Sequence, residues 1–239
     1  AELDDFLFAV KLHQNFTHNR DEFSSKQADE FKFGIEPLRA NNRLGAILVQ
    51  FPWSFKYSAQ ALDHLITLFQ LFSGYPLALE IRHSSWDRTE FYELLKENQA
   101  AFCNIDQPVF QDSIRPETKV TTPGFTYIRL HGRNYKNWFN KDAGRDQRYD
   151  YLYSEAELDE WVNKIKTIAE KAEKIIIVTN NHYQGQAVVN ALQIKNKLTG
   201  EMFDLPPRLI DRFPVLESIA EVKERDQIDL FKKSESKNR

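Results

Sequence analysis

The sequence contains few of the residues and segments that mark several large classes of protein. It has one cysteine and one methionine in 239 residues. The single cysteine, Cys103, excludes an intrachain disulfide and a zinc site built from a cysteine cluster, which fits a reducing compartment. No apolar run approaches the roughly 18 residues that a membrane-spanning helix needs, and no signal segment opens the chain. We therefore expect a soluble, cytoplasmic protein with no membrane partner.

An excess of one charge is also missing, since 32 Lys and Arg stand against 35 Asp and Glu, a formal net charge of −3. A general nucleic-acid-binding domain is normally strongly basic. The sequence has no P-loop, no G-x-G-x-x-G dinucleotide motif and no G-x-S-x-G nucleophile motif. The sequence therefore identifies no cofactor, and it lacks the motifs of P-loop nucleotide-binding proteins, dinucleotide-binding enzymes and hydrolases with a serine nucleophile elbow.

Six short runs rich in β-branched or aromatic residues predict strands. They cover residues 6–12, 46–51, 77–82, 101–105, 126–130 and 175–179. Stretches with helical spacing lie between most of them, including one after the N-cap candidate Ser58 and one after a capping box formed by Ser154 and Glu157. This order along the chain predicts an α/β protein with a parallel sheet.

The predicted strands are aliphatic on one face, and the other face turns polar toward the carboxyl end. In the third strand, Glu80 and Arg82 alternate with aliphatic residues. In the fourth, the pattern assigns Cys103 to the aliphatic face and Asp106 to the polar face. Helices would cover the aliphatic face while the other face closes on itself, which predicts a β/α barrel with its site at the C-terminal mouth. An open sheet with one solvated face is the alternative.

Side chains suited to catalysis or binding cluster where these strands end. Neighbouring strands lie about 4.8 Å apart, so long side chains from several ends can meet on one small ligand. A carboxylate would act as general base and a histidine as general acid. We expect the catalytic residues to be Glu80, Asp106, His131 and His182. We expect the substrate-binding residues to be Lys11, Gln50, Arg82, His83, Arg129, Arg133 and Asn181.

The arginines in this set favour an anionic ligand, because a guanidinium pairs with phosphate or carboxylate in bidentate fashion. Bound metal is disfavoured, since Arg82 and Arg129 would repel a cation, and no metal ligands are assigned. Purely structural roles are also open for two of these positions. Glu80 and Arg82 would then form a structural ion pair, and His83 would turn sideways and hydrogen-bond a loop. A metal-dependent hydrolase is the third functional alternative.

Residues 132–153 form a long connection in which basic and aromatic side chains alternate. Such a mixture can bind single-stranded nucleic acid by stacking. Acidic residues in the same segment reduce its positive charge, so we expect a lid over the barrel mouth. A non-catalytic barrel that binds a ligand or single-stranded nucleic acid through this loop is the alternative.

A set of motifs runs through the chain in order. They are F-A-V-K at 8–11 followed by His18, Q-F-P-W-S-F at 50–55, L-E-I-R-H-S-S-W at 79–86, Asp106, T-P-G-F-T-Y-I-R-L-H-G at 122–132, and N-N-H-Y-Q-G-Q-A at 180–187. By these motifs the sequence resembles domain-of-unknown-function family 72, the YecE-like proteins. The resemblance implies a TIM-barrel-like (β/α) barrel. It also implies that the family's shared polar positions are Lys11, Gln50, Glu80, Arg82, His83, Asp106, Arg129, His131, Asn181 and His182. It implies no reaction.

The sequence departs from the family in its N-terminal part. The family opens with a glycine- and tryptophan-rich strand segment and a second strand unit, and neither is found here. Six βα units are visible where a closed barrel has eight, and the chain begins at Ala1 without a methionine. We therefore expect residues 1–220 to form a single barrel domain that lacks its first two units. Residues 221–239 should form a charged tail.

Together these observations predict an enzyme that acts on a small anionic polar metabolite at the barrel mouth. Hydrolase, isomerase or lyase chemistry would use the same parts. The sequence leaves the reaction, the oligomeric state and metal binding open.

Overall fold

A computed structural model describes residues 6–20, 24–140, 142, 144 and 146–221 of the chain. Six parallel strands form one sheet in the sequential order β1-β2-β3-β4-β5-β6. The strands are β1 (Phe8–Lys11), β2 (Leu44–Gln50), β3 (Leu77–Glu80), β4 (Ala101–Asp106), β5 (Thr126–Leu130) and β6 (Ile175–Thr179). Their positions confirm the six predicted strands, with ends that differ by a few residues.

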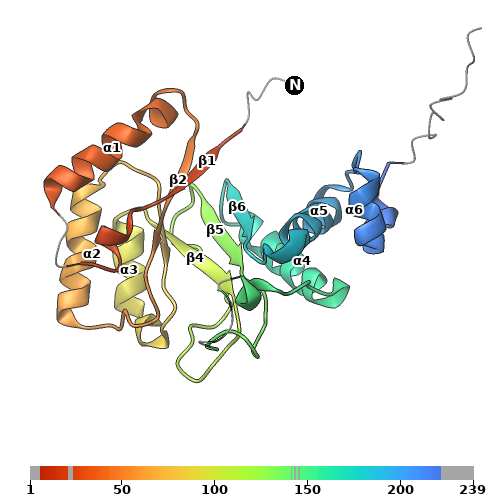
Figure 1. The fold of residues 1–239 in the computed structure, drawn as a ribbon. Coiled ribbons are helices and arrows are strands. Elements are labelled where there is room, and N and C mark those ends of the chain that lie inside the picture. Colours follow the sequence, from red (N-terminus) through yellow and green to blue (C-terminus); the bar gives the residue numbers. More distant parts are fainter. Residues whose placement is uncertain (1–5, 21–23, 141, 143, 145, 222–239) are drawn as a thin grey trace, which may run out of the picture.

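Helices cover the outer side of the sheet, as Figure 1 shows for α1, α2 and α3 beside β1–β4 and for α4 and α5 beyond β5 and β6. They are α1 (Ser25–Ala40), α2 (Ala59–Leu71), α3 (Thr89–Glu97), α4 (Glu155–Ala169), α5 (Gln186–Thr199) and α6 (Pro207–Arg212). The predicted start signals are confirmed, because Ser58 caps α2 and Ser154 with Glu157 forms a capping box on α4.

The sheet curls into a half-barrel, which confirms the predicted α/β architecture at this level. A sequential order of parallel strands with helices on one side is the pattern of a β/α barrel. Closure by two further strands and the single-domain boundary at residue 220 stay predictions. The predicted charged tail covers residues 221–239, and residues 222–239 lie outside the described part of the chain.

Register fixes which residues share the inner, concave face of the sheet. Gln50 is level with Glu80, Ile105 with Arg129, and Arg129 with Val178. Side chains alternate along a strand, so Glu80 and Arg129 lie on the inner face. The predicted polar face is therefore confirmed for β3 and β5.

The prediction for β4 is wrong. Phe102 packs on Phe91 and Tyr92 of α3, with ring centroids 6.4 and 5.6 Å apart, which places it on the outer face. Asp106 shares that face by alternation, whereas Cys103 is level with Tyr127 on the inner face. The pattern was misleading because the outer polar residues of β4 have partners in loops and in α4 rather than in the barrel interior.

The core is divided into clusters along this sheet. The largest joins β1–β4 with α1, α2 and α3 and includes Tyr127 of β5, and a second joins β5 and β6 with α4 and α5. A third, smaller cluster joins α5 with the C-terminal segment around Leu216. No helix within the described ranges is long and apolar enough to cross a membrane.

Candidate functional site

Glu80 is the centre of a polar cluster at the carboxyl end of the inner face. Its carboxylate is completely buried. Oε1 accepts hydrogen bonds from Arg82 Nε at 3.0 Å and Nη2 at 2.7 Å, and Oε2 accepts from Arg129 Nη1. Burial alone would raise the pKa of Glu80, but the guanidiniums of Arg82 and Arg129 hold it well below its usual range. Glu80 is therefore ionised near neutral pH and is a weak base.

Arg129 connects four strands through its guanidinium. Besides Glu80 on β3, Nη1 donates to Gln50 Oε1 on β2 at 2.9 Å, and Nη2 donates to Asn180 Oδ1 at 3.0 Å, directly after β6. Its side chain is only 10% exposed. The Glu80 carboxylate outweighs the effect of burial and raises the pKa of Arg129. Arg129 thus keeps its positive charge in the interior.

The protonation of His131 follows from this network. Asn180 Oδ1 accepts from Arg129, so Asn180 Nδ2 donates to His131 Nδ1 at 3.2 Å. The proton of the neutral ring is then on Nε2, which lies 3.4 Å from Glu80 Oε1. Burial lowers the pKa of His131 to about 4, against the opposing effect of Glu80. His131 is therefore a neutral hydrogen-bond donor near pH 7.

Positive charge exceeds negative charge in this cluster. Arg82 and Arg129 share one carboxylate, and Glu80 is the only acid bonded to them among the described residues. Lys11 lies on the same face, and burial followed by repulsion from Arg129 lowers its pKa. An anion would relieve this excess. We call the set the inner polar cluster; its members are Lys11, Gln50, Glu80, Arg82, Arg129, His131 and Asn180.

Aromatic side chains from the connection after β5 pack against this cluster. Trp138 is 5% exposed, and its ring centroid lies 6.2 Å from that of His131. The Arg82 guanidinium lies 5.9 Å from the Trp138 ring, and Tyr149 lies 6.3 Å from His131. Such contacts shield the charges of the cluster from water. The described part of residues 132–153 thus packs where the sequence predicts a lid.

Asp106 and Arg133 do not join the inner polar cluster. The Arg133 guanidinium donates to both oxygens of Asp106 at 2.8–3.1 Å, and Trp161 Nε1 of α4 donates to Oδ2. Arg133 also pairs with Glu157 and Glu160 at 3.4 and 3.3 Å. The expected placement of Asp106 and Arg133 at the mouth is wrong, because three carboxylates neutralise Arg133 on the helix side of the sheet.

Three more predicted residues lie outside the cluster. His83 turns sideways, since its Nδ1 lies 2.9 Å from Ser85 Oγ, as the structural alternative for this residue predicts. Asn181 donates to Tyr151 O and to Asn190 Oδ1, both at 2.8 Å, on the helix side. His182 is about half exposed, with Nε2 3.4 Å from Asp146. The structure thus brings together Lys11, Gln50, Glu80, Arg82, Arg129 and His131 of the predicted set.

Asn180 is a member of the inner polar cluster that the sequence did not predict, and the pairing of β5 with β6 identifies it. Val178 is level with Arg129, so alternation places Asn180 rather than Asn181 on the inner face. The aromatic neighbours Trp138 and Tyr149 carried no comparable signal, because their positions depend on the path of a long loop.

Within the described ranges, no group of three or more His, Cys, Asp or Glu could hold a metal ion.

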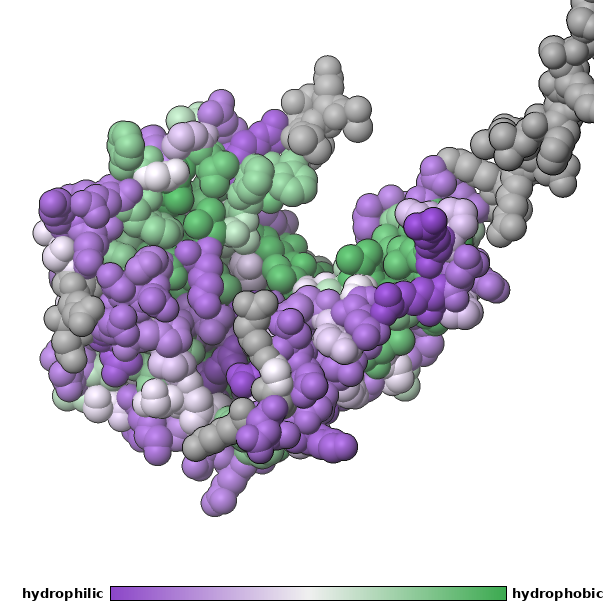
Figure 2. Space-filling model, in the orientation of Figure 1, coloured by the Kyte–Doolittle hydropathy of each residue, from purple (hydrophilic) through white to green (hydrophobic). Residues whose placement is uncertain are grey.

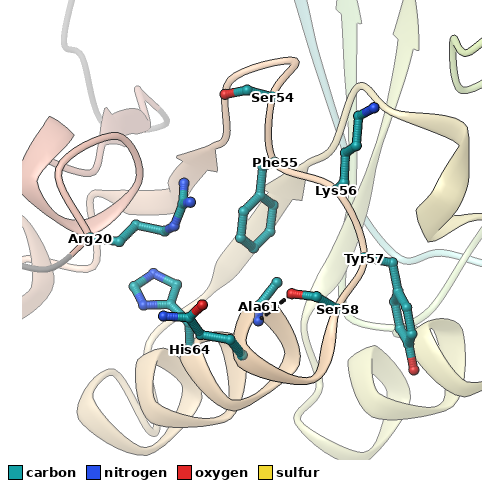
Figure 3. A pocket seen from close by; sticks show the side chains of 9 residues that line it. Arg20, Ser54, Phe55, Lys56, Tyr57, Ser58, Ala61 and His64 are labelled. Atoms are coloured by element: carbon teal, nitrogen blue, oxygen red, sulfur yellow. Dashed lines mark hydrogen bonds between the residues drawn. The ribbon is translucent and has the colours of Figure 1, made fainter.

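A cavity of about 430 Å³ lies on the helix side of the loop between β2 and α2. In Figure 3, Arg20 and His64 lie on one side of Phe55, and Lys56 and Tyr57 on the other. The Arg20 guanidinium lies 4.9 Å from the Phe55 ring, and Ser58 is engaged as the cap of α2. No member of the inner polar cluster lines this cavity, so it is separate from the candidate site.

Comparison with known proteins agrees with this architecture. The profile of the family described as "Protein of unknown function DUF72" matches residues 2–210. The chain belongs to this family. The UPF0759 protein YunF of Bacillus subtilis (strain 168) is 31% identical over 223 residues, which are 88% of this chain and 79% of that protein.

Two crystal structures of DUF72 proteins resemble the fold. The protein TM1631 of Thermotoga maritima MSB8 has a TM-score of 0.77 and 37% identity, over 82% of this chain and 74% of that one. The protein EF0366 of Enterococcus faecalis V583 has a TM-score of 0.76 and 26% identity, over 85% of this chain and 78% of that one. The relatives support the family and the fold, and their names state no activity.

Proposed function

We propose that the inner polar cluster binds a small anionic metabolite. The observation that carries this proposal is that two arginines, Arg129 buried and Arg82 half-buried, share one buried carboxylate. Glu80 neutralises a single positive charge, which leaves one guanidinium and Lys11 to attract an anion. A guanidinium recognises carboxylate and phosphate equally well, so the head group of the ligand is either of these.

Arg82 is the arginine best placed to bind the ligand. Its side chain is 14% exposed, and two of its nitrogens are used by Glu80. Arg129 has contacts with Gln50, Glu80 and Asn180, which make it the fixed part of the site. Arg129 would thus hold its positive charge in a fixed position, and Arg82 would be the arginine that contacts the ligand.

We further propose that the cluster is catalytic and that His131 acts by donating a hydrogen bond. A ring whose pKa is about 4 is a poor imidazolium acid near neutral pH. A neutral Nε2–H beside Arg129 instead stabilises negative charge that develops on a substrate oxygen. A neutral hydrogen-bond donor at this position suits isomerase or lyase chemistry better than a general acid at the same position would. Asp106 and His182 stay predictions as catalytic residues, and their positions give them no part in this mechanism.

Titration calorimetry with inorganic phosphate, acetate and malonate tests the binding proposal. The wild-type protein should bind at least one of these anions, and Arg82→Gln should weaken that binding about tenfold or more, because a charge-assisted hydrogen bond is lost. Arg129 would still neutralise Glu80 in this variant. Arg88→Gln is the matched control, since Arg88 lies outside the cluster and bonds Ser85 O. Equal affinity of wild type and Arg82→Gln would refute the proposal.

A further inference from the structure

Gln107 is a buried side chain with no assigned role. It follows β4 directly and is 2% exposed. Neither its Nε2 nor its Oε1 has a hydrogen-bond partner among the described residues. Buried amides are almost always paired in folded proteins, so one with both ends unpaired requires an explanation.

The register of the sheet places Gln107 beside the inner polar cluster. Ile105 is level with Arg129 on the inner face, and the two strands stay paired to the end, because the backbone N–H of His131 donates to Asp106 O at 2.8 Å. Gln107 comes two residues after Ile105, so alternation puts it on the inner face, level with His131. Adjacent strands are about 4.8 Å apart, which makes Gln107 and His131 neighbours.

Two other groups on this side of the cluster are also unpaired. Arg129 Nε is buried and has no partner in the described part of the chain. His131 Nε2 lies 3.4 Å from Glu80 Oε1, which is longer than a good hydrogen bond. These two groups are donors, whereas Gln107 offers both a donor and an acceptor. The β4–β5 side of the mouth therefore presents several donors and one acceptor.

We propose that Gln107 is a specificity-determining residue that recognises a hydroxyl group on the anionic ligand. The inference rests on the anion binding proposed above. A carboxylate or phosphate oxygen only accepts hydrogen bonds and would leave Gln107 Oε1 unpaired. A hydroxyl donates to Oε1 and accepts from Gln107 Nε2 or His131 Nε2. The ligand is thus a small hydroxylated carboxylate or phosphate ester rather than a simple anion.

Two pairs of ligands that differ in their hydroxyl groups test this inference by calorimetry. One pair is glycerate and propionate, and the other is glycerol 3-phosphate and n-propyl phosphate. The wild-type protein should bind the hydroxylated member of one pair about tenfold more tightly, as expected for one or two well-formed hydrogen bonds. The pair that shows the preference identifies the head group. In Gln107→Leu the ratio of the two dissociation constants should fall to near one.

Thermal unfolding without ligand separates recognition from a structural role. Removing an unpaired buried amide should leave the melting temperature of Gln107→Leu and Gln107→Met equal to or above that of the wild type. A lower melting temperature in both variants would show that the amide stabilises the fold and would overturn the inference. Gln60→Leu is the control, because Gln60 is an exposed glutamine outside the cluster. It should keep the wild-type ratio.

The outcomes distinguish this inference from the proposed function. If wild type binds both members of each pair equally, the hydroxyl recognition is wrong and the anion site stands. If it binds neither pair nor the simple anions, the proposed function fails and the inference falls with it. If the ratio persists in Gln107→Leu, another residue recognises the hydroxyl.

Discussion

At the scale of single residues, one buried histidine gives the inner polar cluster its expected response to pH. His131 is completely buried, with its ring nitrogens beside Glu80 and Asn180 and two aromatic rings packed near it, and it is neutral near pH 7. Two arginines nearby oppose a further positive charge, although Glu80 favours it. Burial is the main cause of the neutral state of His131, and the two arginines add to it.

His131 should make stability depend on pH. Its folded pKa of about 4 lies below the ordinary value of 6.5, so between these values only the unfolded chain takes up a proton. The contribution of His131 to the free energy of unfolding is then complete above pH 6.5 and falls by about 3 kcal/mol on acidification to pH 4. Glu80, whose folded pKa is well below 4.5, adds its own loss only at lower pH. Urea unfolding from pH 4.5 to 7 measures this slope.

His131→Gln should flatten the slope, because the unfolded chain then no longer has this extra proton to bind. His182→Gln is the matched control, since it removes a half-exposed histidine that lies outside the cluster, and it should keep the wild-type slope. An unchanged slope in His131→Gln would contradict the assignment of a neutral buried ring.

At the scale of elements, the junction between β5 and the following loop depends on a glycine. Gly132 has a φ of +87°, and its N–H donates to the Tyr153 hydroxyl at 2.8 Å. An added Cβ would lie 2.6 Å from Tyr151 Cβ, which is closer than real contacts allow. The loop that carries Trp138 therefore begins from a backbone shape that other residues adopt only with strain.

Gly132→Ala should destabilise the protein by about 2 kcal/mol or more, since backbone strain and a steric clash act together. Gly74→Ala is the matched control, because Gly74 has a similar φ of +79° but no atom within 4 Å of the added Cβ. Denaturant unfolding of both variants measures the difference. Equal destabilisation of the two would show that the clash with Tyr151 is relieved without cost.

The alternation of side chains along the sequence predicted the elements and several of the residues that the structure brings together in the inner polar cluster. It succeeded on β3 and β5, where polar residues lie inside the barrel and aliphatic residues face helices. It failed on β4, because Asn104 bonds the backbone of Lys119 at 2.9 Å and Asp106 pairs with Arg133, both outside the barrel. A polar side chain on a strand can belong to a site or can pair with a group elsewhere in the fold. When that group lies in a distant segment, the sequence around the strand does not distinguish the two cases.

At the scale of the whole molecule, both borders of the described sheet are unpaired. Within the described residues, β1 pairs only with β2, and β6 only with β5. Phe6, Leu7 and Phe8 are 52, 37 and 45% exposed at the first border. Figure 2 shows apolar surface on both sides of the notch between these borders. An exposed, apolar strand border is a template for pairing with a second copy.

We expect this chain to self-associate as its concentration rises, through the border of β1. Phe8→Lys should reduce the association, because a charge on an edge strand opposes pairing between copies. Phe33→Lys is the control: Phe33 is 83% exposed on α1, away from the border, and its replacement should leave the association unchanged. Sedimentation velocity over a range of concentrations distinguishes these results. A wild-type chain that stays monomeric throughout would contradict the expectation.

The reach of Arg129 has a consequence for how the molecule comes apart. The apolar core has one cluster centred on β1–β4, which also includes Tyr127 of β5, and a second centred on β5 and β6, and separate clusters can open separately. Arg129 stands on β5 and is bonded to groups from β2, β3 and the end of β6. Opening either part would leave a buried charge without its partners, so we expect the inner polar cluster to make both parts of the sheet unfold together.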